Sequence, residues 1–308
     1  MEESKNFNPA DANAITRRYL DSILIEERLI DAVKASTKTT LFGHTYDSPI
    51  MMPAFSHLDE WVKNGKNSMV EYSAAAKNLN ILNFVGMREN DKMDEIFDTQ
   101  ALTVRIIKPY RDRKKIFDQI EYAKTHNAVG VGMDIDHIFG GQGDYDIVQG
   151  EPMAAQTMDM IREYVQAAAP LPFIVKGVLS VRDAVKCADC QVSAILVSHH
   201  SGRMPYAIPP LKVVPSIRKA VGSEMKIFVD CGISRGADVF KALALGCDGA
   251  AVGRAILPAL KAEGREGVEK YIRKMNDELR MIMGFTGTPS VDKIDPSVLW
   301  MDGCNLGI

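Results

Sequence analysis

The chain has 308 residues, of which 46% are hydrophobic and 25% are charged, and its formal net charge is -3. This composition is typical of a globular protein with a large core. A charge so close to neutral gives no basic surface for nucleic acid or for an anionic membrane. The N-terminal residues are acidic and lack the apolar run of a signal peptide, and no apolar stretch reaches the ~20 residues that span a bilayer. We therefore expect a cytoplasmic protein without nucleic-acid or membrane partners.

Short apolar runs alternate with helical patterns from about residue 50 to about residue 285, which is the order of elements in a parallel sheet with crossover helices. The first three helical patterns cover Ser68–Lys77, Lys114–His126 and Pro152–Ala168. The next three cover Ser180–Lys186, Leu211–Ala220 and Gly236–Leu245, and Met93–Phe97 is a short helical suggestion. The runs predict eight strands: Ile50–Ala54, Ile81–Val85, Leu102–Ile107, Val129–Asp134, Phe173–Lys176, Ala194–Ser198, Ile227–Asp230 and Ala250–Gly253.

Eight strands with intervening helices predict an α/β protein with the TIM (β/α)₈ barrel fold. An open doubly wound sheet is the alternative, but the first strand-to-helix turn lacks the glycine fingerprint of a dinucleotide-binding fold. We expect a helix over Ala14–Val33 outside the barrel and an amphipathic closing helix over Gly267–Met283. The chain would form one barrel domain over residues 1–308, with residues 1–48 as a helical lead-in.

Two consecutive loops near the end of the chain combine glycine with arginine. Gly232 and Arg235 follow the seventh predicted strand, and Gly253 and Arg254 follow the eighth. Glycine lets a backbone approach a ligand closely, and arginine offers a planar fork to phosphate. In a (β/α)₈ barrel, the loops after strands 7 and 8 commonly bind phosphate, so these residues predict a phosphate site.

Other polar residues at the strand ends would face the same mouth of the barrel. Lys176 ends an apolar strand, where a lysine could hold an electron-poor ring or a developing oxyanion, form a Schiff base, or simply reach solvent. His200 and Arg203, three residues apart in SHHSGR, could be a base and an anion clamp around one small substrate. Asp134 ends the fourth strand, where a carboxylate could orient a histidine.

No metal site is expected. Asp136 and His137 follow Asp134 but give no convincing set of three ligands. Cys187 and Cys190 form a CxxC motif that lacks the second pair a zinc site needs and lies where a helix should end, so we interpret them as structural thiols.

Three segments carry a resemblance to a known family: PFIVKGVLSVRDA, AILVSHHSGR and IFVDCGISRGADVFKALALGCDGAAVGR. They resemble the FMN-dependent α-hydroxy acid oxidases and dehydrogenases, which include glycolate oxidase and lactate oxidase. The resemblance continues into GREGVEKYIRKMNDELRMIMGFTG, is weaker before the first strand, and is thin over residues 60 to 165. It implies a TIM barrel with FMN at its C-terminal mouth, and a homo-oligomer, a tetramer or an octamer.

The resemblance also assigns roles to individual residues. Lys176 matches the lysine at the flavin, His200 the active-site base, Arg203 an arginine that holds the substrate carboxylate, and Asp134 the partner of the histidine. Arg235 matches the second arginine of the family's RRG, while Ser234 replaces the first. The implied FMN-binding set is Pro53, Ala54, Lys176, Ser198, Asp230, Gly232, Arg235, Gly253 and Arg254.

Departures from the family pattern concentrate around the substrate. The family's SNHGGR or SNHGAR is SHHSGR here, with His199 and Ser201 as the changed residues. The chain begins too late for the family's N-terminal substrate tyrosine, and the loop after the fourth strand lacks the second carboxylate-binding arginine. The family's glutamine and tyrosine on strand three fall near Arg105 and near Ile107 or Lys108. We therefore expect Arg105 or Lys108 to supply the missing cation for the substrate.

These features predict an FMN-dependent oxidoreductase that oxidises a small 2-hydroxy acid to the 2-oxo acid, with His200 as the base. Two alternatives keep the flavin. One is a different substrate or non-redox flavin chemistry, and the other is a flavin- or partner-binding protein without turnover on 2-hydroxy acids. The intact Lys176, His200, Arg203 and Asp134 favour the oxidoreductase, whereas the rewritten substrate shell favours the alternatives.

Overall fold

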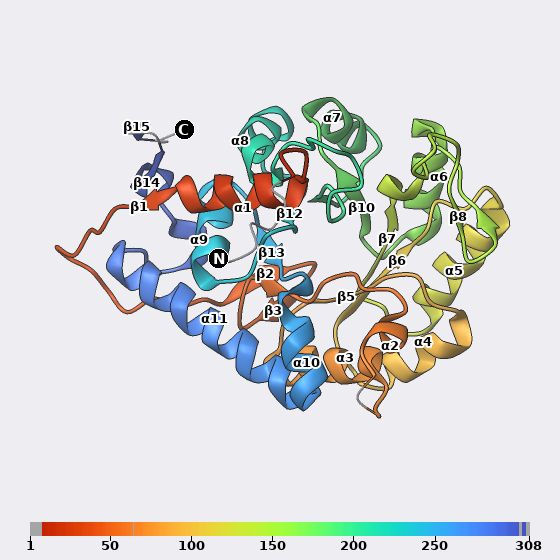
Figure 1. Cartoon of the computed structure of the whole chain (residues 1–308), viewed down its shortest axis with the longest axis horizontal. Helices are drawn as coiled ribbons and strands as arrows, with labels where there is room; N and C mark the ends of the chain where they lie inside the picture. Colours follow the sequence, from red (N-terminus) through yellow and green to blue (C-terminus); the bar gives the residue numbers. More distant parts are fainter. Residues whose placement is uncertain (1–7, 64, 302–303, 306–308) are drawn as a thin grey trace, which may run out of the picture.

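The structure is a computed structural model, and it describes residues 8–63, 65–301 and 304–305. Eight parallel strands form its central sheet in the spatial order β4-β13-β12-β11-β10-β7-β6-β5. The bounds of these strands are Ile50–Met51 (β4), Asn83–Val85 (β5), Thr103–Ile107 (β6), Gly130–Asp134 (β7), Phe173–Val178 (β10), Ala194–Val197 (β11), Lys226–Val229 (β12) and Gly249–Ala251 (β13). The strands at the two ends of this order also meet, since Met52 N–H donates to Leu82 and Gly86 N–H donates to Phe55. The sheet therefore closes on itself as a TIM barrel, and the predicted fold is confirmed (Figure 1).

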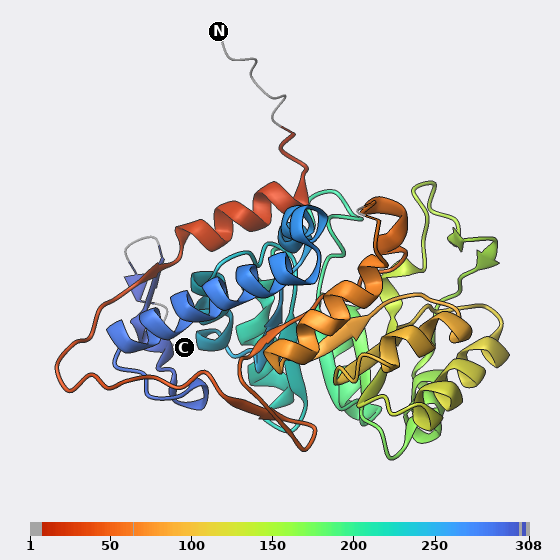
Figure 2. The same ribbon diagram turned by 90° about the horizontal axis from the view of Figure 1, so that it is seen from below.

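Helices surround the strands on the outside of the barrel (Figures 1 and 2). The ring consists of α3 (Ser68–Leu79), α4 (Asn90–Phe97), α5 (Arg113–Thr125), α6 (Met158–Ala168), α7 (Val181–Asp189), α8 (Pro210–Val221), α9 (Gly236–Ala244), α10 (Leu257–Glu263) and α11 (Arg265–Phe285). The described loops also contain the 3₁₀ turns Ile135–His137 (η1), Arg254–Ile256 (η2), Val291–Lys293 (η3) and Pro296–Val298 (η4). Among the residues described, no helix combines the length and the apolar character that crossing a membrane requires.

The two ends of the barrel differ. At the N-terminal end, the hairpin β2 (Thr39–Leu41) and β3 (His44–Tyr46) closes the barrel, because Leu41 and Tyr46 pack into its interior. At the opposite end lie α1 (Ala12–Ser22), α2 (Leu58–Trp61) and the loop that carries the short strands β8 (Ile147–Val148) and β9 (Glu151–Pro152) (Figure 2). The open mouth is therefore at the C-terminal ends of the strands.

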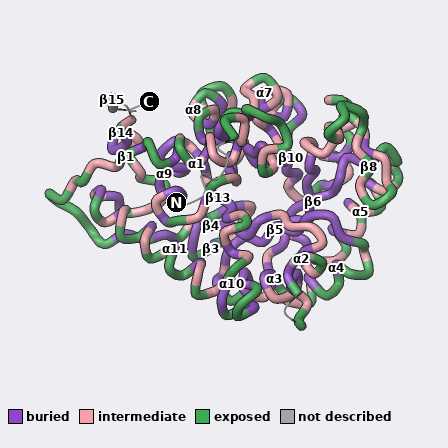
Figure 3. The backbone as a smooth tube through the Cα atoms, in the orientation of Figure 1, coloured by how far each residue is buried: buried purple, intermediate pink, exposed green. Residues whose placement is uncertain are grey.

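Alternation along each strand decides which side chains enter the barrel. Ile106, Ile174, Leu196 and Phe228 belong to the interior cluster, whereas their sequence neighbours, such as Ile107 and Val197, pack outward against the helices. Figure 3 shows the strands as an almost continuously buried centre. The same alternation continues to the C-terminal end of each strand. A side chain two positions after a residue of the interior cluster is therefore on the same side of the strand and faces the mouth of the barrel.

The bounds of two predicted helices differ most from those in the structure. The helix expected over Ala14–Val33 is shorter: α1 ends at Ser22, and β1 (Leu24–Ile25) pairs with β14 (Leu299–Met301), which also pairs with β15 (Cys304–Asn305). Ile23 and Ile25 suit this extended backbone, because β-branched side chains favour strands. The helix expected from Pro152 begins at Met158, because Thr157 caps it by accepting from Met160 N–H.

The substitution Gly236→Ala tests how closely α9 packs on α11. An added Cβ there would lie 2.3 Å from the Met275 carbonyl oxygen and 2.4 Å from the Leu279 nitrogen. We expect Gly236→Ala to lower the free energy of unfolding by about 1–3 kcal/mol, because the helices must move apart. Gly284→Ala in α11 is the matched control, since a Cβ there meets nothing within 4 Å. It should gain ~0.5–1 kcal/mol in urea denaturation, and an equal loss in both variants would contradict the packing argument.

Candidate active site at the barrel mouth

The strand alternation brings five predicted residues to the mouth. Lys108, Asp134, Lys176, Ser198 and Asp230 each lie two residues after a position that faces the barrel interior. They come from β6, β7, β10, β11 and β12, or from the residue that follows the strand. Because parallel strands end at one edge of the barrel, these side chains gather around a single site.

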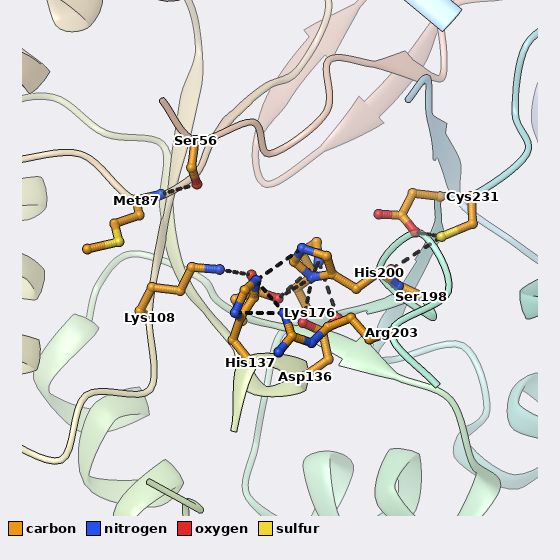
Figure 4. A network of polar contacts seen from close by, with 12 residues as sticks. Ser56, Met87, Lys108, Asp136, His137, Lys176, Ser198, His200, Arg203 and Cys231 are labelled. Atoms are coloured by element: carbon orange, nitrogen blue, oxygen red, sulfur yellow. Dashed lines mark hydrogen bonds and ion pairs between the residues drawn. The ribbon is translucent and has the colours of Figure 1, made fainter. Parts of the chain in front are cut away.

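Asp134 lies between two buried lysines, Lys108 and Lys176, both of which are labelled in Figure 4. Its two oxygens accept from Lys108 at 2.7 Å and from Lys176 at 2.9 Å. Burial alone would raise the pKa of Asp134, but the two ammonium groups hold it well below its ordinary value. Burial lowers the pKa of Lys108, whereas Asp134 and Asp136 outweigh burial at Lys176 and raise its pKa. Asp134 is therefore an ionised carboxylate shared by two lysines.

His200 contacts both this group and the open mouth. Its Nδ1 lies 2.6 Å from Asp136, 3.0 Å from Lys176 and 3.4 Å from Asp134. Burial and Lys176 lower the pKa of His200, but the two carboxylates outweigh them and the pKa is raised. The residue has a φ of 47°, and Ser198 accepts its backbone N–H. A basic imidazole held in this way is suited to proton transfer.

Arg203 reaches the same place from the loop after β11, but it already has partners. It donates to Asp146 at 2.8 Å and to the Phe139 carbonyl at 2.7 Å, both in the loop between β7 and β8. His137 lies between Arg203 and His200, with 3.1 Å to the arginine and 3.3 Å to His200 Nε2. The guanidinium group that we predicted to bind a substrate anion is therefore already bound to the carboxylate of Asp146.

Asp134, His137 and His200 have ligand atoms within 4.8 Å of one another, the spacing of a metal site. The electrostatics disfavour a cation there, because Lys108 and Lys176 already bind both oxygens of Asp134. Burial, Lys108 and other neighbours lower the pKa of His137 to about 3, so this ring is neutral. The arrangement is better suited to binding an anion or moving a proton than to holding a metal.

A cavity opens beside Lys176 toward the loops after β12 and β13. Its lining contains seven of the nine residues expected to bind FMN and also Asn13, Phe55, His200, Ser201 and Cys231; the seven are Pro53, Ala54, Lys176, Asp230, Gly232, Gly253 and Arg254. At Gly253 an added Cβ would meet nothing within 4 Å, so the backbone borders open space. An arginine beside a glycine backbone suits a phosphate, and a buried lysine suits a ring that gains negative charge. This donor set fits FMN.

The helix α1 lies across this side of the mouth. Asn13 donates to the Ser201 carbonyl at 2.8 Å and accepts from Arg254 at 3.1 Å. Thr16 contacts His199 Nε2 at 2.9 Å, and His199 Nδ1 accepts the backbone N–H of Gly202. Because Nδ1 is the acceptor, His199 Nε2 carries the proton and donates to Thr16. His199 thus joins α1 to the loop of His200 and is not part of the base.

Two predicted site residues lie elsewhere. Arg105 shares the outward side of β6 with Ile107, donates to the Arg88 carbonyl, and lies over the ring of Tyr122 at 5.6 Å. It is therefore separated from the mouth by the strand itself. Arg235 precedes α9 and is half-exposed, with Asp21 at 3.3 Å. Of the two candidates for the missing second cation, Lys108 faces the mouth and Arg105 does not.

The structure adds residues that the sequence reasoning did not use. Asp136 is the carboxylate closest to His200, and Asp146 binds Arg203. The position of Asp136 two residues after Asp134 was a signal for a second carboxylate at the mouth. Asp146 gave no such signal, because it lies in a long loop whose path depends on tertiary contacts.

One mouth of the closed barrel holds a buried lysine, a histidine in contact with carboxylates, and a cavity bordered by glycine and arginine. These features are typical of a cofactor-dependent enzyme of the (β/α)₈ class. Comparisons with known proteins identify the class further. The FMN-dependent dehydrogenase family matches residues 10–167 and 151–301, which together cover almost the whole described chain. The chain therefore belongs to the FMN-dependent dehydrogenases, and it is an oxidoreductase with FMN as its cofactor.

Individual relatives agree with this family. A 2-hydroxyacid oxidase of Dictyostelium discoideum is 25% identical over 309 residues, which is 90% of this chain and 79% of the relative. An L-lactate oxidase of a Roseobacter species is 36% identical over 164 residues, but that alignment spans only 53% of this chain and 44% of the relative. A structure of mandelate oxidase with an FMN adduct has the same fold, with a TM-score of 0.84, 23% identity, and coverage of 97% of this chain and 93% of that chain.

Thr16 tests the attachment of α1 to the active-site loop. Thr16 and His199 are both buried, so Thr16→Val leaves the Nε2 proton of His199 without an acceptor. We expect this variant to lose about 1–3 kcal/mol of stability in urea denaturation. Thr16→Ser keeps the hydroxyl group and serves as the control. If the serine variant loses as much stability as the valine variant, the methyl group and not the hydrogen bond holds α1.

Proposed function

We propose that this protein oxidises a small 2-hydroxy acid to the corresponding 2-oxo acid. The observation that carries the proposal is His200, a half-buried, basic imidazole that contacts Asp136 and Lys176 and is linked to Arg203 through His137. The 2-hydroxyacid oxidase and L-lactate oxidase names of the relatives support the substrate class. The net change converts R-CHOH-COO⁻ into R-CO-COO⁻ and releases two electrons and two protons.

FMN, when bound, accepts the two electrons of the substrate C–H bond. Its binding residues would be Pro53, Ala54, Lys176, Ser198, Asp230, Gly232, Gly253 and Arg254; Arg235, which lies outside the cavity and pairs with Asp21, is left out of this set. Lys176, which holds its positive charge between two carboxylates, supports negative charge at the neighbouring ring. His200 takes the proton of the substrate hydroxyl group at Nε2, the nitrogen that faces away from Asp136.

The substrate carboxylate would bind Arg203, with Lys108 as a second cation deeper in the mouth. Arg203 is the more accessible of the two, since the side chain of Lys108 is 5% exposed and that of Arg203 is 29% exposed. A carboxylate ligand would take the place of Asp146 on the guanidinium group. Asp146 then acts as an internal competitor that a substrate displaces.

The second candidate function is a flavin-binding protein with a different substrate, with non-redox flavin chemistry, or without turnover. The neutralisation of Arg203 by Asp146 and the position of His137 between Arg203 and His200 favour it. Anaerobic spectra of the FMN-loaded protein with a panel of 2-hydroxy acids separate the two functions. Bleaching of the flavin band by one acid supports oxidation, whereas a band that no acid bleaches rejects it.

We further propose that the protein works in the cytoplasm as a homo-oligomer. Leu29, Ile30, Met281 and Phe285 are exposed apolar side chains, and Leu29, Met281 and Phe285 line one apolar groove. Such a surface supports self-association. Light scattering during gel filtration measures the assembly, and a monomer at micromolar concentration would reject it.

His200→Asn tests the base. We expect flavin reduction to slow by roughly 10²–10⁴-fold, because proton removal from the hydroxyl group loses its acceptor. FMN binding should persist, since the cofactor set is intact, and the visible spectrum of the purified variant measures it. Anaerobic stopped-flow absorbance measures the rate. Reduction at the wild-type rate would rule out His200 as the base.

Asp146→Asn tests the internal competitor at Arg203. Removing the carboxylate should lower the Kd for a 2-oxo acid product up to about fivefold, which corresponds to a partly exposed ion pair of up to ~1 kcal/mol. The perturbation of the flavin spectrum during titration gives the Kd. Asp144→Asn, an exposed change in the same loop, is the control. A weaker complex in Asp146→Asn would mean that Asp146 positions Arg203 for the substrate.

A further inference from the structure

The two carboxylates at the end of β7 have different surroundings. Asp134 ends the strand, and Asp136 follows in η1, so both reach the mouth from one short segment. Both oxygens of Asp134 are within 2.9 Å of a lysine ammonium group. The oxygen Oδ1 of Asp136 has only His200 as its hydrogen-bond partner among the described contacts, at 2.6 Å.

Hydrogen-bond accounting assigns the proton on His200 Nδ1. This nitrogen lies near both Asp136 Oδ1 and the ammonium group of Lys176, and it can make only one hydrogen bond in the ring plane. Lys176 already has carboxylate acceptors in Asp134 and Asp136. If Nδ1 carries the proton and donates to Asp136, every one of these groups has a partner. The opposite tautomer would leave Asp136 Oδ1 without a donor unless Asp136 were protonated.

The backbone around Asp136 is shaped for this contact. Gly177 has a φ of +95°, and a Cβ on it would lie within 2.6–2.7 Å of three atoms of the Asp136 side chain. Only a residue without a side chain leaves room for Asp136 beneath His200. The position of the Asp136 side chain therefore depends on Gly177 in β10 as well as on the backbone of η1.

Resting on the proposed function, we propose that Asp136 is the positioning residue of the base, fixing His200 with its proton on Nδ1, while Asp134 serves as the counter-ion of Lys108 and Lys176. Nε2 is then left unprotonated toward the mouth, where the neutral His137 lies 3.3 Å away. This gives to Asp136 the role that the family resemblance assigns to Asp134, the partner of the histidine.

The charged groups around His200 determine how its pKa changes when one of them is removed. Lys176 faces it from β10, Asp134 and Asp136 from β7 and η1, His137 from η1, and Arg203 lies beyond His137. The carboxylates stabilise the imidazolium form, and Lys176 opposes it. Loss of the Asp136 charge therefore lowers the pKa of His200. Because the base works only when neutral, the acid limb of its pH profile should move to lower pH.

The test compares Asp136→Asn with Asp144→Asn in the FMN-loaded protein. In ¹⁵N-histidine NMR spectra, with His200→Asn to assign the signal, the wild type should show a downfield Nδ1–H for His200. Asp136→Asn should shift this signal and lower the pKa of His200, while Asp144→Asn should leave both unchanged. An unchanged signal and pKa in Asp136→Asn would overturn the proposal, and this measurement needs no turnover.

Kinetics give the second measurement. In Asp136→Asn the maximal rate of flavin reduction should fall by about 10²–10⁴-fold, as when a histidine base can adopt the wrong tautomer, and the acid limb should move to lower pH. A merely structural role would lower the rate without moving the limb, and that result overturns the proposal. Asp136→Glu should recover part of the rate. If no 2-hydroxy acid reduces the flavin of the wild-type protein but the NMR result is as expected, the proposed function fails and the positioning of His200 by Asp136 stands.

Discussion

The mouth of this barrel depends on one buried carboxylate shared by two lysines. Asp134 ends the central strand of three, and the neighbouring strands β6 and β10 bring Lys108 and Lys176 to it from either side. None of the three charges is stable there alone, because removing one partner of a buried ion pair typically costs about 3–5 kcal/mol. The group therefore ties the ends of three strands together and fixes the position of Lys176 at the cofactor cavity.

His200 connects this buried group to the surface. On its inner side lie Asp136 and Lys176, and on its outer side a row of contacts leads from His137 to Arg203 and Asp146. Polar contacts of this kind are stronger in a low-dielectric interior than in water. A ligand that enters the mouth meets this row from its outer end, where the contacts are more exposed. The inner end can stay rigid while the outer end exchanges partners.

The sequence predicted the barrel well, because continuous apolar runs and their spacing report a parallel sheet directly. The helix expected over Ala14–Val33 was wrong beyond Ser22, since the antiparallel pairing of β1 with β14 is a contact over more than 270 residues that local patterns do not contain. The same limit applies to Asp146, whose ion pair with Arg203 depends on the path of a long loop.

Alternation along the strands could have sorted the candidate cations. Arg105 and Lys108 were proposed together, although they are three positions apart and must point to opposite sides of a strand. Ile106 faces the interior, so Lys108 faces the mouth and Arg105 does not. The roles of Asp134 and Asp136 could not be separated in this way, because both reach the mouth and only their contacts with Lys108, Lys176 and His200 distinguish them.

The divergence of this chain has a physical pattern. The cofactor cavity is lined by glycines, strand ends and a buried lysine, which the closed barrel holds in place. The proposed substrate side consists of Arg203, His137 and Asp146, which lie outside the strands, in segments that tolerate substitution more readily. Asp146 already gives Arg203 a carboxylate partner, so a ligand carboxylate that replaces it leaves the charge at the guanidinium group unchanged. Discrimination between ligands at this mouth then depends less on the charge of the ligand than on the hydrogen bonds that the rest of the ligand makes with His137 and His200.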